Sequence, residues 1–332
     1  MSSLVNAIGR LFIVGYPGAE PPDEFLEFVN TAKLGGVIFF ADNCPSPSQL
    51  QDSIRTIKSC YGERSPFMAI DQEGGRVTRL KGAPAEFRAA AEYGKDDSIE
   101  AFIEDYTRSA VFLESLGINL NLAPVADIGI NPNNSCLKDR CFGSEAGKVA
   151  VFVKAAVKVA RRSGLLSCLK HFPGLGAATN DPHQLTAVAD YTAYEWKKRE
   201  SIPFREGVVA GVDMIMTTHL SLPRIDRTIV TSSQRIISEL LRGELGFDGP
   251  VITDDLTMKG AATLGSIGRR TVAAFNAGHD ILLFGQDYRT ARRAYEYFVD
   301  AFLRQDILEE KITAALDRVS GTQCKLNGSV LR

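Results

Sequence analysis

An acidic residue and a histidine, Asp181 and His183, stand two positions apart in a stretch rich in glycine and proline. A carboxylate that close to an imidazole can hold its tautomer and orientation and raise its basicity. Such a pair is a candidate general acid/base, because an imidazole exchanges protons near neutral pH. The spacing is equally compatible with a surface loop that carries an ordinary solvated histidine.

Other ionisable residues recur at one kind of place, directly after short apolar runs. A charged group at the end of an apolar run is costly to bury unless it is paired or used. Because ionisable residues follow five of the runs, the sequence predicts that they share one pocket. The residues concerned are Asp71 to Arg76, Asp127, Lys170 with His171, His219, and Asp254 with Asp255.

The apolar runs are continuous rather than alternating, as expected for parallel strands that are buried on both faces. Between them lie stretches with apolar residues at helical spacing, several of which end at glycine. Eight such units without a linker predict a single-domain α/β protein over residues 1–332, a TIM-like (β/α)8 barrel. The eight expected strands are Leu11–Gly15, Gly36–Phe40, Phe67–Ile70, Leu120–Val125, Leu165–Leu169, Met214–Thr217, Pro250–Thr253 and Asp280–Gly285.

A doubly wound sheet is the alternative fold. It usually carries a glycine-rich phosphate loop after its first strand, and the turn Gly15-Tyr16-Pro17-Gly18 does not fit that motif. In a barrel, functional groups lie just past the carboxyl-terminal ends of the strands. The ionisable residues above stand at that position.

Composition and charge exclude several classes of protein. The 332 residues are 45% hydrophobic, which is not the composition of a disordered or collagen-like chain. A net charge of -2 argues against a nucleic-acid partner. No run approaches the roughly 20 apolar residues of a membrane helix, and the first residues make a poor signal peptide. We therefore expect a cytoplasmic monomer with no nucleic-acid or membrane partner.

The six cysteines are scattered, and none forms a Cys-x-x-Cys pair. A structural zinc site and a disulfide framework are therefore not expected. A catalytic metal site is the alternative, with the histidines and aspartates named above as its ligands. However, the sequence has no His-x-His or His-x-x-x-His pair. We expect neither a metal nor a cofactor.

Three segments of the chain resemble the signatures of family-3 glycoside hydrolases. They are Asp71–Arg76, Lys170–Gly176 with Asp181-Pro182-His183, and Ile252–Gly260. They occur in the family's order at three separate strand ends, and the resemblance covers residues 8–320. It is strongest to the single-domain bacterial β-N-acetylglucosaminidases of cell-wall recycling.

The resemblance implies roles for individual residues. Asp254 matches the nucleophile, His183 the acid/base, and Asp181 the partner of that histidine; a covalent glycosyl-enzyme on Asp254 gives retention of configuration. Without the resemblance, Asp254 reads as a helix N-cap. The implied sugar-binding residues are Asp71, Arg79, Arg140, Lys170 and His171. Asp71 would accept hydrogen bonds from hydroxyls, and Lys170 and His171 would donate them. The alternative for both arginines is a salt bridge between adjacent loops.

Two positions depart from the family pattern. Leu175 stands where the family usually has histidine, and Pro182 where it usually has serine. The first removes a polar group beside the pocket, and the second stiffens the loop that carries His183. Neither removes an expected catalytic group.

The expected activity is the release of terminal N-acetylglucosamine from small carbohydrate or muropeptide substrates. A β-glucosidase, a broader β-hexosaminidase and a phosphorylase remain open, since the same signatures serve them. A metal-dependent barrel hydrolase and a non-catalytic sugar-binding barrel are the alternatives from other classes.

Overall fold

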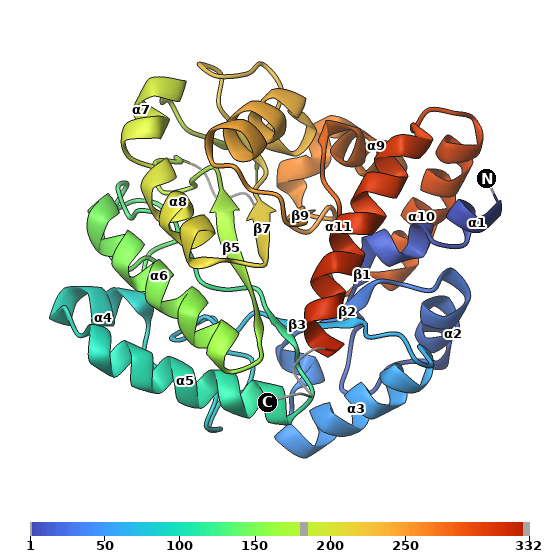
Figure 1. Cartoon of the computed structure of the whole chain (residues 1–332), viewed down its shortest axis with the longest axis horizontal. Coiled ribbons are helices and arrows are strands. Elements are labelled where there is room, and N and C mark those ends of the chain that lie inside the picture. Colours follow the sequence, from blue (N-terminus) through green and yellow to red (C-terminus); the bar gives the residue numbers. More distant parts are fainter. Residues whose placement is uncertain (1, 180–184, 328–332) are drawn as a thin grey trace.

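Eight parallel strands form a barrel that is surrounded by helices in the computed structural model, which describes residues 2–179 and 185–327 (Figure 1). The strand order is β10-β1-β2-β3-β4-β5-β7-β9. A parallel bridge between Ile252 and Ile281 joins β9 to the residue before β10 and closes the ring. The (β/α)8 barrel is therefore confirmed, and the doubly wound alternative is wrong. The barrel strands are β1 (Phe12–Val14), β2 (Gly36–Phe39), β3 (Phe67–Ile70), β4 (Leu120–Asn121), β5 (Leu166–Phe172), β7 (Met214–Thr217), β9 (Val251–Ile252) and β10 (Leu282–Phe284).

Two strands, β4 and β5, differ at one end from their expected bounds by more than two residues. Strand β4 is regular only over Leu120–Asn121. Single backbone hydrogen bonds continue beyond it, from Leu122 to Ile70 and from Cys168 to Ala123, while Pro124 has no N–H to donate. An isolated bridge then pairs Val125 with Lys170. Strand β5 continues through Phe172, so Lys170 and His171 lie within the strand and are not loop residues. A strand holds a side chain more rigidly than a loop does, which matters for the pocket described below.

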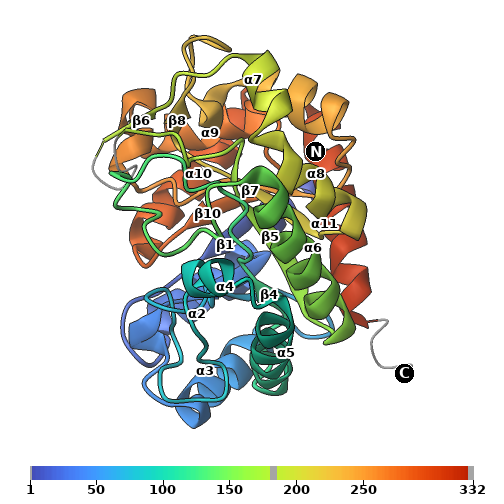
Figure 2. The ribbon, with the colours of Figure 1, turned by 90° about the vertical axis from the view of Figure 1, so that its left-hand side faces the viewer.

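The helices cover the outside of the barrel, as Figures 1 and 2 show from two directions. Helix α6 is representative: Val149, Phe152 and Val153 are buried at helical spacing on its inner face. Each buried side chain of this kind contributes about 1.5–3 kcal/mol of transfer free energy. The helices are α1 (Ser2–Val5), α2 (Asp23–Ala32), α3 (Pro47–Ser59), α4 (Ala90–Asp96), α5 (Ile99–Ser115), α6 (Ala146–Arg162), α7 (Ala193–Lys198), α8 (Ser201–Ala210), α9 (Ile267–Ala277), α10 (Tyr288–Leu303) and α11 (Glu309–Asn327).

Shorter elements complete the fold. Strands β6 (Ala187–Val188) and β8 (Leu220–Ser221) form a parallel pair beside the barrel. Between β8 and β9 lies a π-helical segment, Ile236–Glu244. Within the described ranges, no helix combines the length and the apolar character needed to cross a membrane.

Candidate active site

A pocket of about 380 Å³ lies at the carboxyl-terminal ends of the barrel strands. The segments that line it come from β2, β5, β7 and β10 and from the loops after β2, β3, β4 and β9. All six described residues to which the family resemblance assigns a role line this one pocket. They are Asp71, Arg79, Arg140, Lys170, His171 and Asp254. The two remaining residues, Asp181 and His183, lie outside the described part of the chain.

Gln72 holds the loop after β3 in place through its backbone and its side chain. The backbone N–H of Gln72 donates to Oδ1 of Asn121 on β4 at 3.0 Å, and Nδ2 of Asn121 donates to the backbone carbonyl of Gln72 at 2.9 Å. The side-chain carbonyl of Gln72 accepts the backbone N–H of Arg79. Gly74 has φ +89°, a conformation that favours glycine, and a Cβ there would lie 2.3 Å from the carbonyl oxygen of Arg88. These contacts fix the loop that carries Asp71, Glu73 and Arg79.

The ammonium of Lys170 lies between two carboxylates. Its Nζ donates to Oδ1 of Asp71 at 2.6 Å and lies 2.5 Å from Oε1 of Glu73. Burial acts to lower the pKa of Lys170, but the two carboxylates outweigh it and raise that pKa. Burial acts to raise the pKa of Asp71, but Lys170 and Arg79 hold it below its ordinary value. The three side chains are therefore charged together at neutral pH.

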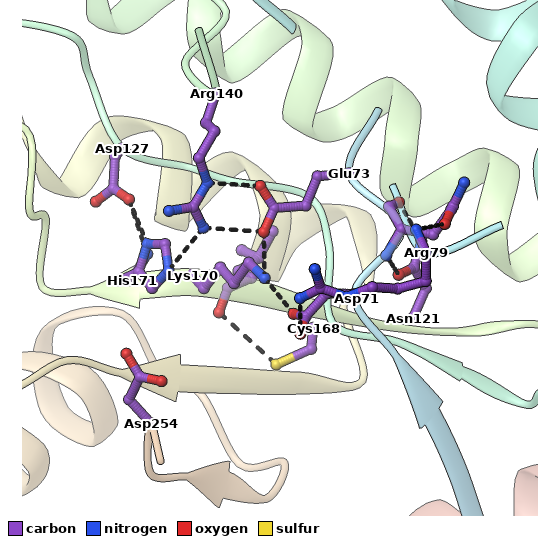
Figure 3. Close-up of polar contacts among 12 residues, drawn as sticks. Asp71, Glu73, Arg79, Asn121, Asp127, Arg140, Cys168, Lys170, His171 and Asp254 are labelled. Atoms are coloured by element: carbon purple, nitrogen blue, oxygen red, sulfur yellow. Dashed lines mark hydrogen bonds and ion pairs between the residues drawn. The ribbon is translucent and has the colours of Figure 1, made fainter. Parts of the chain in front are cut away.

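Arg140 makes a two-pronged ion pair with Glu73 (Figure 3). Its Nε and Nη2 donate to the two carboxylate oxygens at 2.7 and 2.9 Å. Burial acts to raise the pKa of Glu73, but Arg140 and Lys170 reverse this and hold it well below its ordinary value. The salt-bridge alternative for Arg140 is thus present in the structure. The guanidinium also lines the pocket, so the pairing does not remove it from a ligand's reach.

His171 is held from both sides of its ring. Nδ1 lies 2.6 Å from Oδ2 of Asp127, which can only accept, so Nδ1 carries the proton. Nη2 of Arg140 can only donate and lies 3.2 Å from Nε2, so Nε2 is the acceptor. These partners assign the neutral Nδ1–H tautomer. In that form the single lone pair of Nε2 already accepts from Arg140, so this arrangement leaves no free donor or acceptor on the His171 ring for a hydroxyl.

Arg79 closes the opposite end of this network. Its Nη2 donates to Oδ2 of Asp71 at 3.2 Å, and its guanidinium carbon lies 5.6 Å from the ring centroid of Phe40. Both side chains line the pocket. Arg79 therefore stands between a carboxylate and an aromatic ring, where a cation is attracted by each.

Asp254 approaches the pocket from the loop after β9, across from this network (Figure 3). Its Oδ1 accepts the backbone N–H of Asp255 at 2.8 Å. Asp255 also lines the pocket. The two carboxylates differ in their hydrogen bonds, because Oδ1 of Asp255 accepts from both the N–H and the hydroxyl of Thr257. Burial raises the pKa of Asp255, and the neighbouring Asp254 adds to the effect.

Two of the ionisable residues expected at strand ends, Asp127 and His219, are not part of the pocket lining. Asp127 is fully buried behind His171, where it also accepts the backbone N–H of Leu175 at 2.6 Å. His219 is fully buried behind the β9 loop, where Nε2 donates to the carbonyl of Asp255 and Nδ1 accepts from Thr231. Both residues support groups that line the pocket, and the prediction of one shared pocket holds for the ionisable residues of the other three strand ends.

Two further residues, Leu175 and Trp196, are fully buried. Leu175 is fully buried in the core and is not part of the pocket lining, whereas Pro182 lies outside the described residues. Trp196 is fully buried and donates Nε1–H to the carbonyl of Pro173 at 2.9 Å. That bond ties helix α7 to the turn that follows β5.

Sequence reasoning gave no individual role to Glu73 and placed Asp127 in the pocket rather than behind it. Glu73 holds two pocket residues, Arg140 and Lys170, and Asp127 holds one, His171. Glu73 lay within the quoted motif Asp71–Arg76, and Asp127 ended an apolar run, so the available signal was their position. Within residues 2–179 and 185–327, no group of three His, Cys, Asp or Glu side chains converges in a way that could hold a metal ion.

The chain belongs to glycosyl hydrolase family 3, because the family's N-terminal domain matches residues 4–321. Beta-hexosaminidase A of Pseudoalteromonas piscicida is 32% identical over 92% of this chain, and the match covers 56% of that protein. A beta-hexosaminidase of Stenotrophomonas maltophilia (strain R551-3) is 30% identical over 82% of each chain.

The fold has solved relatives as well. A family 3 beta-N-acetylglucosaminidase from Paenibacillus sp. str. FPU-7 superposes with a TM-score of 0.94 and 30% sequence identity. The match covers 98% of this chain and 63% of that one. This chain therefore spans less than two thirds of the Pseudoalteromonas and Paenibacillus proteins.

Proposed function

We propose that the protein is a retaining exo-β-N-acetylglucosaminidase that releases terminal N-acetylglucosamine from muropeptide-type fragments. In these fragments the sugar is linked to anhydro-N-acetylmuramic acid. The observation that carries the proposal is the shared pocket, in which Asp254 faces the residues that the resemblance links to sugar binding. The family membership supports glycoside hydrolysis, and the names of the hexosaminidase relatives support the sugar class.

Asp254 is the proposed nucleophile. A carboxylate oxygen attacks the anomeric carbon, the C–O bond to the aglycone breaks, and a covalent glycosyl-enzyme forms. The backbone N–H of Asp255 holds Oδ1 of Asp254, while within the described residues Oδ2 has no hydrogen-bond partner. Oδ2 of Asp254 is therefore the oxygen that we propose attacks the anomeric carbon. Asp255 is the weaker candidate for two reasons. Its Oδ1 already accepts a hydrogen bond from Thr257, and the pKa of Asp255 is raised.

His183 is the proposed acid/base, oriented by Asp181. It gives its proton to the leaving oxygen in the first step and takes a proton from water in the second. Water then attacks the anomeric carbon and frees Asp254, and two inversions leave the configuration unchanged. The support for these two residues is their match to the Asp-x-His loop of the family.

The pocket's size and lining support a single bound sugar. A volume of about 380 Å³ lies at the lower end of the range for small-molecule sites, so the aglycone would extend outside. Charged donors and acceptors suit the hydroxyls, and Met216 and Leu283 offer apolar contact to the acetamido methyl group. A cytoplasmic location and a monomeric state belong to the same proposal.

A panel of aryl glycosides tests the proposal. The expected result is cleavage of the N-acetyl-β-glucosaminide at least tenfold faster than the β-glucoside, with free N-acetylglucosamine as the product whether or not phosphate is present. A muropeptide fragment should then be cleaved by the same preparation. Faster cleavage of the glucoside would contradict the sugar class, and a sugar 1-phosphate as product would identify a phosphorylase.

A further inference from the structure

Glu73 lies at the centre of the pocket's hydrogen-bond network. Its side chain is only 4% exposed, yet its two oxygens face three N–H donors. Oε2 accepts from Nε of Arg140, while Oε1 accepts from Nη2 of Arg140 and lies 2.5 Å from Nζ of Lys170. One carboxylate therefore fixes two cations that come from different elements, the loop after β4 and strand β5.

We propose that Glu73 is the positioning residue that places Arg140 and Lys170 for sugar binding. The inference rests on the proposed function, because only there do these two cations contact sugar. A buried carboxylate is retained at low cost when donors surround it, and here three donors do. The two-pronged contact with a planar guanidinium fixes orientation as well as distance.

Glu73 is itself held by its backbone. Its N–H donates to the carbonyl of Val77 at 2.9 Å, and the N–H of Gly75 donates to the carbonyl of Phe87 at 2.9 Å. Gly74 between them takes the left-handed conformation already described. The carboxylate thus projects from a tight turn whose backbone is bonded on both sides, which lowers the entropy cost of holding two partners.

The two cations depend on Glu73 unequally. Lys170 keeps a second carboxylate, because its Nζ also donates to Asp71 at 2.6 Å. Within the described residues, Arg140 forms an ion pair with Glu73 alone, and its side chain is 10% exposed. Loss of the Glu73 charge would leave Arg140 as a buried cation without a counter-ion, free to turn toward the carbonyl of Cys136 or toward His171. The inference therefore predicts coupling mainly through Arg140.

A double-mutant cycle with Glu73→Gln and Arg140→Gln tests this coupling. The readouts are the dissociation constant of N-acetylglucosamine, kcat and KM for the aryl N-acetyl-β-glucosaminide, and the thermal unfolding curve. Glu73→Gln should weaken sugar binding and lower kcat/KM by about tenfold or more. The double variant should be no worse than Arg140→Gln, because both substitutions remove the same placement. Glu73→Asp should recover part of the loss, since it restores the charge.

Asp139→Asn is the matched control. It removes the partner of Arg76 from the same two loops, but that pair is half-exposed and Asp139 is not part of the pocket lining. Its kinetics should stay within twofold of the wild-type chain. Additive losses in the cycle, or sugar binding by Glu73→Gln within twofold of wild type, would overturn the inference alone. If Glu73→Gln does not fold, Glu73→Asp with Arg140→Gln forms the cycle. A wild-type chain that cleaves no N-acetylglucosaminide would overturn the proposed function as well.

Discussion

Nδ1 of His171 lies 2.6 Å from Oδ2 of Asp127, and the Asp127 side chain is fully buried at this contact. The pair forms one end of a continuous chain of hydrogen bonds and ion pairs along the pocket. The chain runs through Asp127, His171, Arg140, Glu73, Lys170, Asp71 and Arg79. Each side chain in it has its orientation set by its neighbours, so the pocket is organised before any sugar enters.

Asp127→Asn should disturb this end of the chain. The two Asp127 oxygens accept from the backbone N–H and Nδ1 of His171 and from the N–H of Leu175. An amide replaces one acceptor with a donor, so one of these N–H groups loses its partner at a cost of about 1–3 kcal/mol. We expect kcat/KM to fall about tenfold to a hundredfold, measured on the aryl substrate, with a lowered Tm. The control Asp190→Asn changes an exposed carboxylate and should leave both unchanged.

The lowered pKa values of two buried carboxylates indicate how the free energy of unfolding depends on pH. The pKa values of Asp71 and Glu73 are lowered in the folded state by Lys170 with Arg79 and with Arg140, respectively. A lowered folded pKa contributes stability above the unfolded value, near pH 4 for carboxyl groups, and loses it as the pH falls toward the folded value. The free energy of unfolding should therefore decrease below about pH 4.5. Denaturant titrations should give a shallower decrease for Glu73→Gln, and an equal slope in both chains would contradict the assignment.

Gly285→Ala should destabilise the packing around Asp255, the neighbour of Asp254. A Cβ at Gly285 would lie 2.4 Å from Oδ2 of Asp255, closer than real contacts allow. The Asp255 carboxylate must then move or the strand must shift, at a cost of about 1–3 kcal/mol. Gly147→Ala in α6 is the control, because no atom lies within 4 Å of its added Cβ. Thermal unfolding should show a lower Tm for the first variant and an unchanged or higher Tm for the second.

His183→Ala tests the proposed acid/base through the leaving group. A poor leaving group needs a proton in the first step, whereas an activated aryl oxide does not. The variant should lose at least a hundredfold in rate on a disaccharide and much less on a dinitrophenyl glycoside. Wild-type rates on the disaccharide would show that another group supplies the proton.

The barrel could be predicted because continuous apolar runs and helical stretches alternate along the chain, a pattern set by local burial. The meeting of Lys170, His171 and Asp254 followed from the rule that strand ends share one face. The place of Glu73 could not be predicted, because its partner Arg140 is 67 residues away in an irregular loop. The burial of Asp127 and His219 behind the pocket was missed for a related reason. Position at a strand end does not specify whether a side chain points into the cavity or behind it.

Mass spectrometry of a trapped intermediate tests the central claim most directly. A fluorinated N-acetylglucosaminide that slows the second step should leave one sugar on the protein. Fragmentation of the labelled peptide should locate that sugar on Asp254, and Asp254→Asn should abolish the label. A sugar attached to Asp255 or to another side chain, or turnover of the reagent with inversion of configuration, would contradict the account.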